Sequence, residues 1–87
     1  MKRTDRQIYE AISLGMSRTE VRRIAGPPFL ALEHEVYYGG APEIENWQRQ
    51  TTPATVRIIF SADNRVVKKV FNDGKLVLHE AVPGMND

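Results

Sequence analysis

The sequence predicts one small α+β domain in which two short N-terminal helices pack on one face of a three- to four-stranded antiparallel meander sheet. Residues 4–25 carry two sets of helix start signals, each followed by apolar side chains three and four positions apart. Residues 54–80 alternate apolar and polar side chains between turn-forming residues, which is typical of half-buried strands. A chain of 87 residues fits a single domain, 1–87, with a thin core.

The first predicted helix covers residues 4–14. Thr4 and Gln7 have the spacing of a capping box, in which each residue satisfies the other's backbone N–H. Ile8 and Ile12 lie on one apolar stripe. Gly15 predicts the end of this helix, because glycine adopts a left-handed conformation at low cost.

The second predicted helix covers residues 17–25. Ser17 and Glu20 form another potential capping box, and Met16 and Val21 have the spacing of a hydrophobic staple. Its outer face is predicted to carry Arg18, Arg22 and Arg23. The run Gly26, Pro27, Pro28 ends the helix, since proline can neither donate its N–H nor extend the turn.

The remaining chain predicts strands, with one long loop. A strand is expected over 33–38, and 39–53 is read as a loop that contains the single tryptophan, Trp47. The clearest strand covers 54–61, with Val56, Ile58 and Phe60 directed to the core. Two further strands are expected over 65–71 and 75–80, with turns at 62–64 and 72–74. The ends of the chain, 1–3 and 82–87, are expected to be frayed.

Two short helices can cover only one face of the predicted sheet. Several aliphatic side chains should then lie on the opposite, open face, where an apolar patch often marks an interaction site. We expect the open face and the loop 39–53 to form the binding surface for a partner protein, with Ile59, Val67, Tyr38 and Trp47 as its contact residues. A homodimer could use the same open face. The alternative is that these are scattered surface residues chosen for strand propensity.

The sequence contains no recognisable catalytic or metal-binding motif, and we expect neither enzymatic activity nor a cofactor. Cysteine is absent, which excludes a thiolate nucleophile or a Cys-ligated metal. His34 and His79 are the only histidines, and neither belongs to a ligand motif.

The charge pattern gives two further expectations. Residues 1–25 hold six basic and three acidic side chains, a balance of +3, although the whole chain is only +1. Arg18, Arg22 and Arg23 are therefore predicted to contact an anionic lipid surface. Nucleic-acid binding is disfavoured by the low net charge, but a small DNA-binding protein that uses the helix at 17–25 is retained as an alternative.

The stretch from Gly15 to Pro28 resembles the SmpA/OmlA (BamE-like) outer-membrane lipoprotein family. The positions that carry the resemblance are Gly15, Met16, Ser17, Glu20, Val21, Gly26 and Pro28. It extends to the alternating run 56–60, its acidic turn and Arg65-Val66. The family's lipid-bearing cysteine is missing, and the loop 39–53 departs from the pattern.

The resemblance implies a fold of the β-lactamase-inhibitor-protein type and a non-catalytic, protein-binding role. The family acts in the bacterial cell envelope as an accessory of the outer-membrane β-barrel assembly complex. An inhibitor-like module that binds an enzyme is the second implied role. The expected location is the periplasm, at the inner face of the outer membrane, if a leader was removed, and the cytoplasm otherwise.

Overall fold

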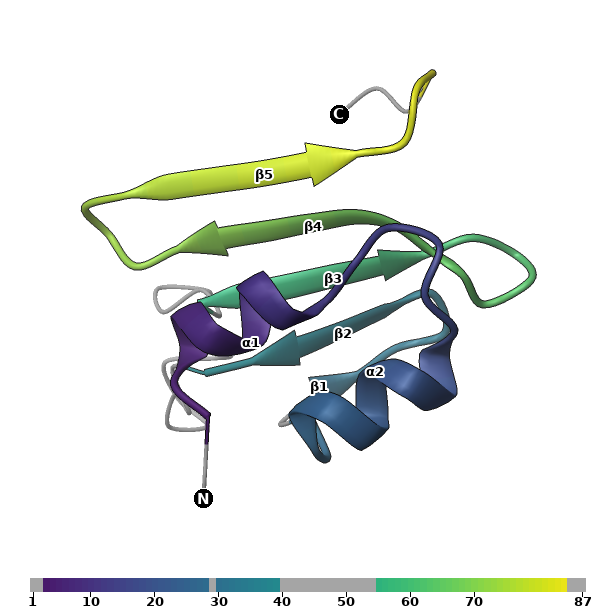
Figure 1. Ribbon diagram of the computed structural model, residues 1–87, viewed down its shortest axis with the longest axis horizontal. Coiled ribbons are helices and arrows are strands. Elements are labelled where there is room, and N and C mark those ends of the chain that lie inside the picture. The colour runs from purple at the N-terminus through teal and green to yellow at the C-terminus, as the bar shows by residue number, and fades with distance from the viewer. Residues whose placement is uncertain (1–2, 29, 40–54, 85–87) are drawn as a thin grey trace.

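The computed structural model has the predicted α+β architecture (Figure 1), and it describes residues 3–28, 30–39 and 55–84. Two short helices precede a five-stranded antiparallel sheet, one or two strands more than expected. In chain order the elements are α1 (Asp5–Ala11), α2 (Arg18–Ala25), β1 (Leu30–Ala31), β2 (Glu35–Tyr38), β3 (Val56–Phe60), β4 (Val66–Asn72) and β5 (Val77–Ala81).

Helix α1 begins as predicted but ends three residues early. The Thr4 hydroxyl accepts the Gln7 N–H at 3.1 Å, and the Gln7 side chain accepts the Thr4 N–H at 2.9 Å, so the capping box is confirmed. The last helical residue is Ala11, and Ile12 is already extended. The prediction that Gly15 ends this helix is therefore wrong.

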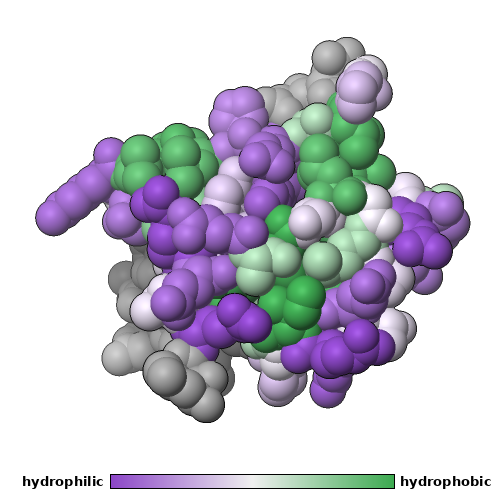
Figure 2. All heavy atoms as spheres, in the orientation of Figure 1, coloured by the Kyte–Doolittle hydropathy of each residue, from purple (hydrophilic) through white to green (hydrophobic). Residues whose placement is uncertain are grey.

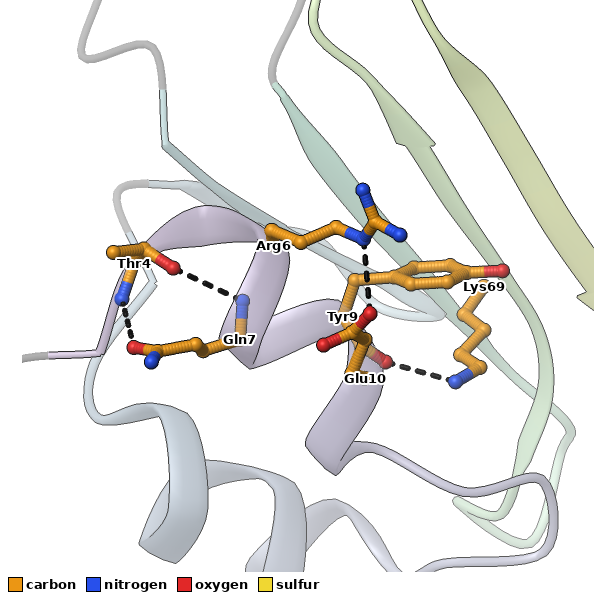
Figure 3. A network of polar contacts seen from close by, with 6 residues as sticks. All are labelled: Thr4, Arg6, Gln7, Tyr9, Glu10 and Lys69. Carbon is orange, nitrogen blue, oxygen red and sulfur yellow. Dashed lines mark hydrogen bonds and ion pairs between the residues drawn. The ribbon is translucent and has the colours of Figure 1, made fainter.

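A lysine from the sheet caps the C-terminal end of α1. The ammonium of Lys69 on β4 donates to the carbonyl oxygen of Tyr9 at 2.8 Å (Figure 3). It also donates to the carbonyl oxygen of Ile12 at 2.7 Å. These carbonyls would otherwise lack intrahelical partners at the helix end. A positive charge at a helix C-terminus also interacts favourably with the helix dipole.

Helix α2 matches its prediction closely. The Ser17 hydroxyl accepts the Glu20 N–H at 3.1 Å, and the Glu20 carboxylate accepts the Ser17 N–H at 3.2 Å, which confirms this capping box. The helix ends at Ala25, and Gly26 follows with a φ of 81°. Val21 is buried in the core, and Met16 packs against the same core.

The segment between the helices is docked onto the sheet by its backbone. Val66 N–H donates to the Met16 carbonyl at 2.9 Å, and Gly15 N–H donates to the Val66 carbonyl at 2.8 Å. Arg18 N–H reaches the Asn64 carbonyl at 3.0 Å. The segment therefore pairs with the start of β4 like a very short strand, and this pairing fixes where α2 starts.

The sheet is a simple meander with the strand order β1-β2-β3-β4-β5, in which every neighbouring pair is antiparallel. The strand expected over 33–38 is shorter at its start, because residues 32–34 form the bend between β1 and β2. Both helices lie on the same face of this sheet (Figure 1).

The core lies between the helices and the central strands. Its buried apolar side chains come from both layers and are Ile8, Tyr9, Ile12, Val21, Val36, Tyr38, Val56, Ile58, Phe60, Val66 and Phe71. The three core positions predicted on the central strand, at 56, 58 and 60, are confirmed.

A β-bulge breaks the strict alternation of β4. The register shifts between Ile59 and Phe60, so that Ile59 pairs with Lys68 and Phe60 with Val66. Val66 and Lys69 both face the helices although they are three positions apart, which alternation of two does not allow. Within the described ranges, no helix is long and apolar enough to cross a membrane.

Candidate functional site

A hollow in the described part of the chain lies between α2, the β1–β2 edge and the turn that precedes β4. We call it the α2 groove; its volume is about 420 Å³. Its lining residues are Ser17, Arg18, Thr19, Val21, Arg22, Pro28, Ala31, Val36, Tyr38, Phe60, Asp63, Asn64 and Arg65. This volume falls within the range of small-ligand sites, about 300–1,000 Å³.

The floor of the α2 groove is apolar because it is the edge of the hydrophobic core. Val21, Val36 and Phe60 line it, and each is at most 4% exposed. Tyr38 lines it too, and its hydroxyl donates to the Gly26 carbonyl at 2.9 Å. Burial raises the pKa of the Tyr38 phenol, so this group stays protonated and acts as a hydrogen-bond donor at neutral pH.

Arg18 holds one end of the groove in place. Its guanidinium donates to the carbonyl oxygens of Leu32 and Glu33, both at 2.7 Å, and lies 4.9 Å from the centre of the Phe60 ring. These contacts join the first turn of α2 to the bend between β1 and β2. Both hydrogen-bond acceptors are neutral carbonyls, so the positive charge of Arg18 is not cancelled.

The rim of the groove is predominantly basic. Arg18, Arg22 and Arg65 line it, against a single carboxylate, Asp63. Arg65 donates to the Gly15 carbonyl at 3.3 Å, and Arg22 is exposed. Among the described residues, none of these three guanidinium groups forms an ion pair with a carboxylate. The groove therefore combines an apolar floor with an excess of positive charge on its rim.

The groove gathers residues that the sequence assigned to three different groups. Ser17, Val21 and Pro28 belong to the motif that resembles a known family. Arg18 and Arg22 belong to the expected lipid contact, and Tyr38 belongs to the expected partner-binding set. Arg23, the third arginine of that set, lies outside the lining and is exposed.

Tyr38 is in the groove and not on the open sheet face, so that part of the prediction is wrong. It pairs with Val56 and faces the helices, where it is only 4% exposed. The adjacent tyrosine occupies the other face. Tyr37 is half-buried, and its hydroxyl donates to the Glu35 carboxylate at 2.5 Å.

The open face is more polar at its centre than the sequence suggested. Glu35 accepts from Tyr37 and, at 2.8 Å, from Arg57. Ile59 and Val67 are both half-buried, and the neighbour of Ile59 on β4 is Lys68. Their expected role in partner binding stays a prediction. Trp47 and most of the loop 39–53 lie outside the described residues.

The two histidines lie apart. The His34 imidazole is 3.7 Å from the Glu33 carboxylate, in the bend between β1 and β2, while His79 is on β5 at the other edge. Across the described ranges, no three His, Asp or Glu side chains are grouped so that they could hold a metal ion.

The chain was compared with models of protein families, with curated proteins and with solved structures. None of the three comparisons finds a match. The α2 groove is therefore interpreted from its own chemistry.

Sequence reasoning missed part of the groove because its members are distant in the chain. Arg65 and Phe60 meet α2 only through the sheet, and nothing near either residue marks it as a site. One signal was available. The turn 62–64 precedes the strand predicted over 65–71, and in the structure Arg65 forms an isolated β-bridge with Ser17, the N-cap residue of α2.

Proposed function

We propose that the chain is a non-catalytic protein-binding module whose α2 groove holds a segment of a partner protein. The observation that supports this proposal is the pairing of an apolar floor with a rim of three arginines, Arg18, Arg22 and Arg65. An apolar floor gains from burial of an apolar side chain, at about 25 cal/mol per Å². Guanidinium groups bind carboxylates well and often with two hydrogen bonds.

The chemistry of the groove specifies the partner segment. It should carry one apolar side chain for the floor near Val21 and Phe60, and a carboxylate next to it for Arg22 or Arg65. A volume of about 420 Å³ holds a few side chains and no folded element. An acidic and apolar peptide segment fits these conditions.

We extend the proposal to the bacterial cell envelope on the basis of the family resemblance. Its motif residues Ser17, Val21 and Pro28 line the groove, so a ligand there would contact the part of the chain that carries the resemblance. An accessory role in outer-membrane protein assembly, or an inhibitor-like role toward an enzyme, would each use such a segment. Fractionation of cells that express the full reading frame, with its upstream region, tests the location.

Arg22 and Arg23 provide a matched pair of variants for the binding test. Both are exposed, both lie in the last turn of α2, and only Arg22 lines the groove. Arg22→Glu and Arg23→Glu should therefore lose about the same favourable interaction with the helix dipole. Only Arg22→Glu reverses a charge at the groove.

The experiment titrates the ¹⁵N-labelled full chain with synthetic peptides that alternate Glu with Leu or Phe. We expect shifts at groove residues, about 10- to 100-fold weaker binding for Arg22→Glu, and little change for Arg23→Glu, since a charge-assisted hydrogen bond is worth about 1.5–3 kcal/mol. Peptides with Lys in place of Glu should not bind. Equal losses in the two variants, or no shifts in the groove, would contradict the proposal.

The same pair of variants tests the predicted lipid contact. An anionic lipid surface would sense Arg22 and Arg23 alike, so both variants should lose binding to vesicles that contain phosphatidylglycerol. A salt-dependent mobility shift with duplex DNA, lost in both variants, would favour the DNA-binding alternative instead.

A further inference from the structure

The bend between β1 and β2 carries an exposed apolar side chain next to an exposed carboxylate. Leu32 is 47% exposed, and the side chain of Glu33 is 86% exposed. The His34 imidazole lies 3.7 Å from the Glu33 carboxylate, and within the described ranges no lysine or arginine pairs with this carboxylate. Leu32 and Glu33 therefore have the two features that the α2 groove requires of its occupant.

This bend lies beside the α2 groove. The Arg18 guanidinium, which lines the groove, donates to the carbonyl oxygens of Leu32 and Glu33, both at 2.7 Å. Neither Leu32 nor Glu33 lines the groove of its own chain. The backbone of the bend is thus held next to the groove while both side chains stay exposed, so this pair does not fill the groove from within the same chain.

The charge of the groove complements that of the bend. Figure 2 shows hydrophilic residues over the lower right of the view, where Figure 1 places α2, with apolar atoms toward the centre. Three arginines line the groove against a single carboxylate, Asp63. An excess of positive charge next to an apolar floor matches a bend that presents a leucine and a carboxylate.

We propose that two copies of the chain form a twofold dimer in which Leu32 of each copy enters the α2 groove of the other, and Glu33 pairs with Arg22. This dimer rests on the proposed function, because a second copy becomes the occupant of the same groove. The donated bend and the receiving groove both contact Arg18, so a single twofold axis near Arg18 serves both contacts. A bend far from the groove would instead produce a ring or an open filament.

Charge reversal at Glu33 and Arg22 tests the contact in the full chain. In light scattering, wild type should rise from 9.9 kDa toward twice that mass as its concentration approaches about 1 mM. Glu33→Arg and Arg22→Glu each place like charges at both contacts, so each should weaken dimerisation at least about 10-fold. An equimolar mixture of the two variants should dimerise as wild type does, because every contact in the mixed dimer joins opposite charges.

Arg23→Glu supplies the matched control for the charge reversals. Arg23 is exposed in the same turn of α2 as Arg22, but it lies outside the groove. Arg23→Glu should dimerise like wild type, and it should not draw Glu33→Arg into dimers when the two are mixed.

A pair of leucine variants tests the apolar part of the contact. Leu32→Ala should weaken dimerisation about 10-fold or more, since it removes the side chain that enters the groove. Leu76→Ala alters a leucine of similar exposure, 40%, at the opposite edge of the sheet and should have no effect. Circular dichroism checks that the variants fold, and if the charge reversals unfold, this pair decides alone.

The results separate the dimer from the function of the groove. A wild type that stays monomeric at about 1 mM, or a mixture of folded Glu33→Arg and Arg22→Glu that stays monomeric, would overturn the dimer. Shifts of groove residues by the acidic peptides would then still support the proposed function. If the dimer forms, the same peptides should dissociate it, because both occupy one groove; a dimer that binds the peptides without dissociating would also overturn this interface.

Discussion

The ammonium of Lys69 lies 2.8 Å from the carbonyl oxygen of Tyr9 and 4.2 Å from the centre of its ring (Figure 3). The Lys69 side chain is 5% exposed, so this charge is almost removed from water. Burial lowers the pKa of Lys69, and the nearby Glu80 carboxylate, at 3.9 Å, partly opposes this effect. Lys69 thus joins α1 to the sheet at the cost of desolvation.

Substitution Lys69→Met should destabilise the protein. The variant keeps most of the side-chain volume but leaves the Tyr9 and Ile12 carbonyls without their donor. Each lost hydrogen bond to a charged group costs about 1.5–3 kcal/mol, and relief of the desolvation penalty offsets part of this loss. We expect a net loss of about 1–3 kcal/mol in urea unfolding.

The exposed Lys75 supplies the control for this comparison, because Lys75→Met changes the same charge without breaking a buried contact. It should shift stability by no more than about 0.5 kcal/mol. If Lys69→Met were as stable as wild type, the lysine would not hold the end of α1.

Substitution Tyr38→Phe should loosen the connection between β2 and the end of α2. The Tyr38 hydroxyl donates to the Gly26 carbonyl at 2.9 Å, and Tyr38 is 4% exposed. Removal of the hydroxyl leaves this carbonyl without the donor, at a cost of about 1–2 kcal/mol. Thermal unfolding measures the loss, and a stability unchanged from wild type would show that the bond is replaced by water.

Substitution Gly39→Ala should be more harmful than Gly74→Ala. Both glycines have positive φ angles, 75° and 92°, which cost an alanine about 1–2 kcal/mol. A Cβ on Gly39 would also collide with the Asp5 side chain at the start of α1, whereas one on Gly74 meets open space. The Asp5 carboxylate is the end of a flexible side chain and can turn away from the added methyl group, so we expect Gly39→Ala to lose only about 0.5 kcal/mol more in urea unfolding. A smaller loss than that of Gly74→Ala would contradict the close approach.

The stabilising effect of Glu35 should depend on pH. Hydrogen bonds from Arg57 and then Tyr37 lower the pKa of Glu35 from its ordinary value of 4.5. Because the folded pKa lies below the unfolded one, the carboxylate stabilises the fold above about pH 4.5, and this contribution is lost as pH falls through the folded pKa. Arg57 is 44% exposed, so solvent limits the effect to about 0.5–1 kcal/mol.

The variant Glu35→Gln isolates this contribution. The difference in unfolding free energy between wild type and Glu35→Gln should be largest near pH 7 and should shrink below pH 4.5. Glu33→Gln, at an 86% exposed side chain, serves as the control and should show little difference at any pH. A difference that stays constant from pH 7 to pH 3 would exclude Glu35 as the titrating group.

Both capping boxes and the end of α2 could be predicted from the sequence because the residues that form them are close in the chain. Thr4 with Gln7 and Ser17 with Glu20 are three residues apart, so local spacing determines their hydrogen bonds. The alternation from 56 to 60 likewise specified which side of the central strand is buried. These features require no knowledge of the rest of the fold.

Only the tertiary structure decided where α1 ends, which way the tyrosines face and what forms the α2 groove. Lys69 reaches Tyr9 across 60 residues of chain, and the bulge at Ile59 and Phe60 changes the alternation of β4. Such contacts depend on strand register and on which layers pack together. A local pattern of residue types cannot encode them, because the partners meet only after the sheet has formed.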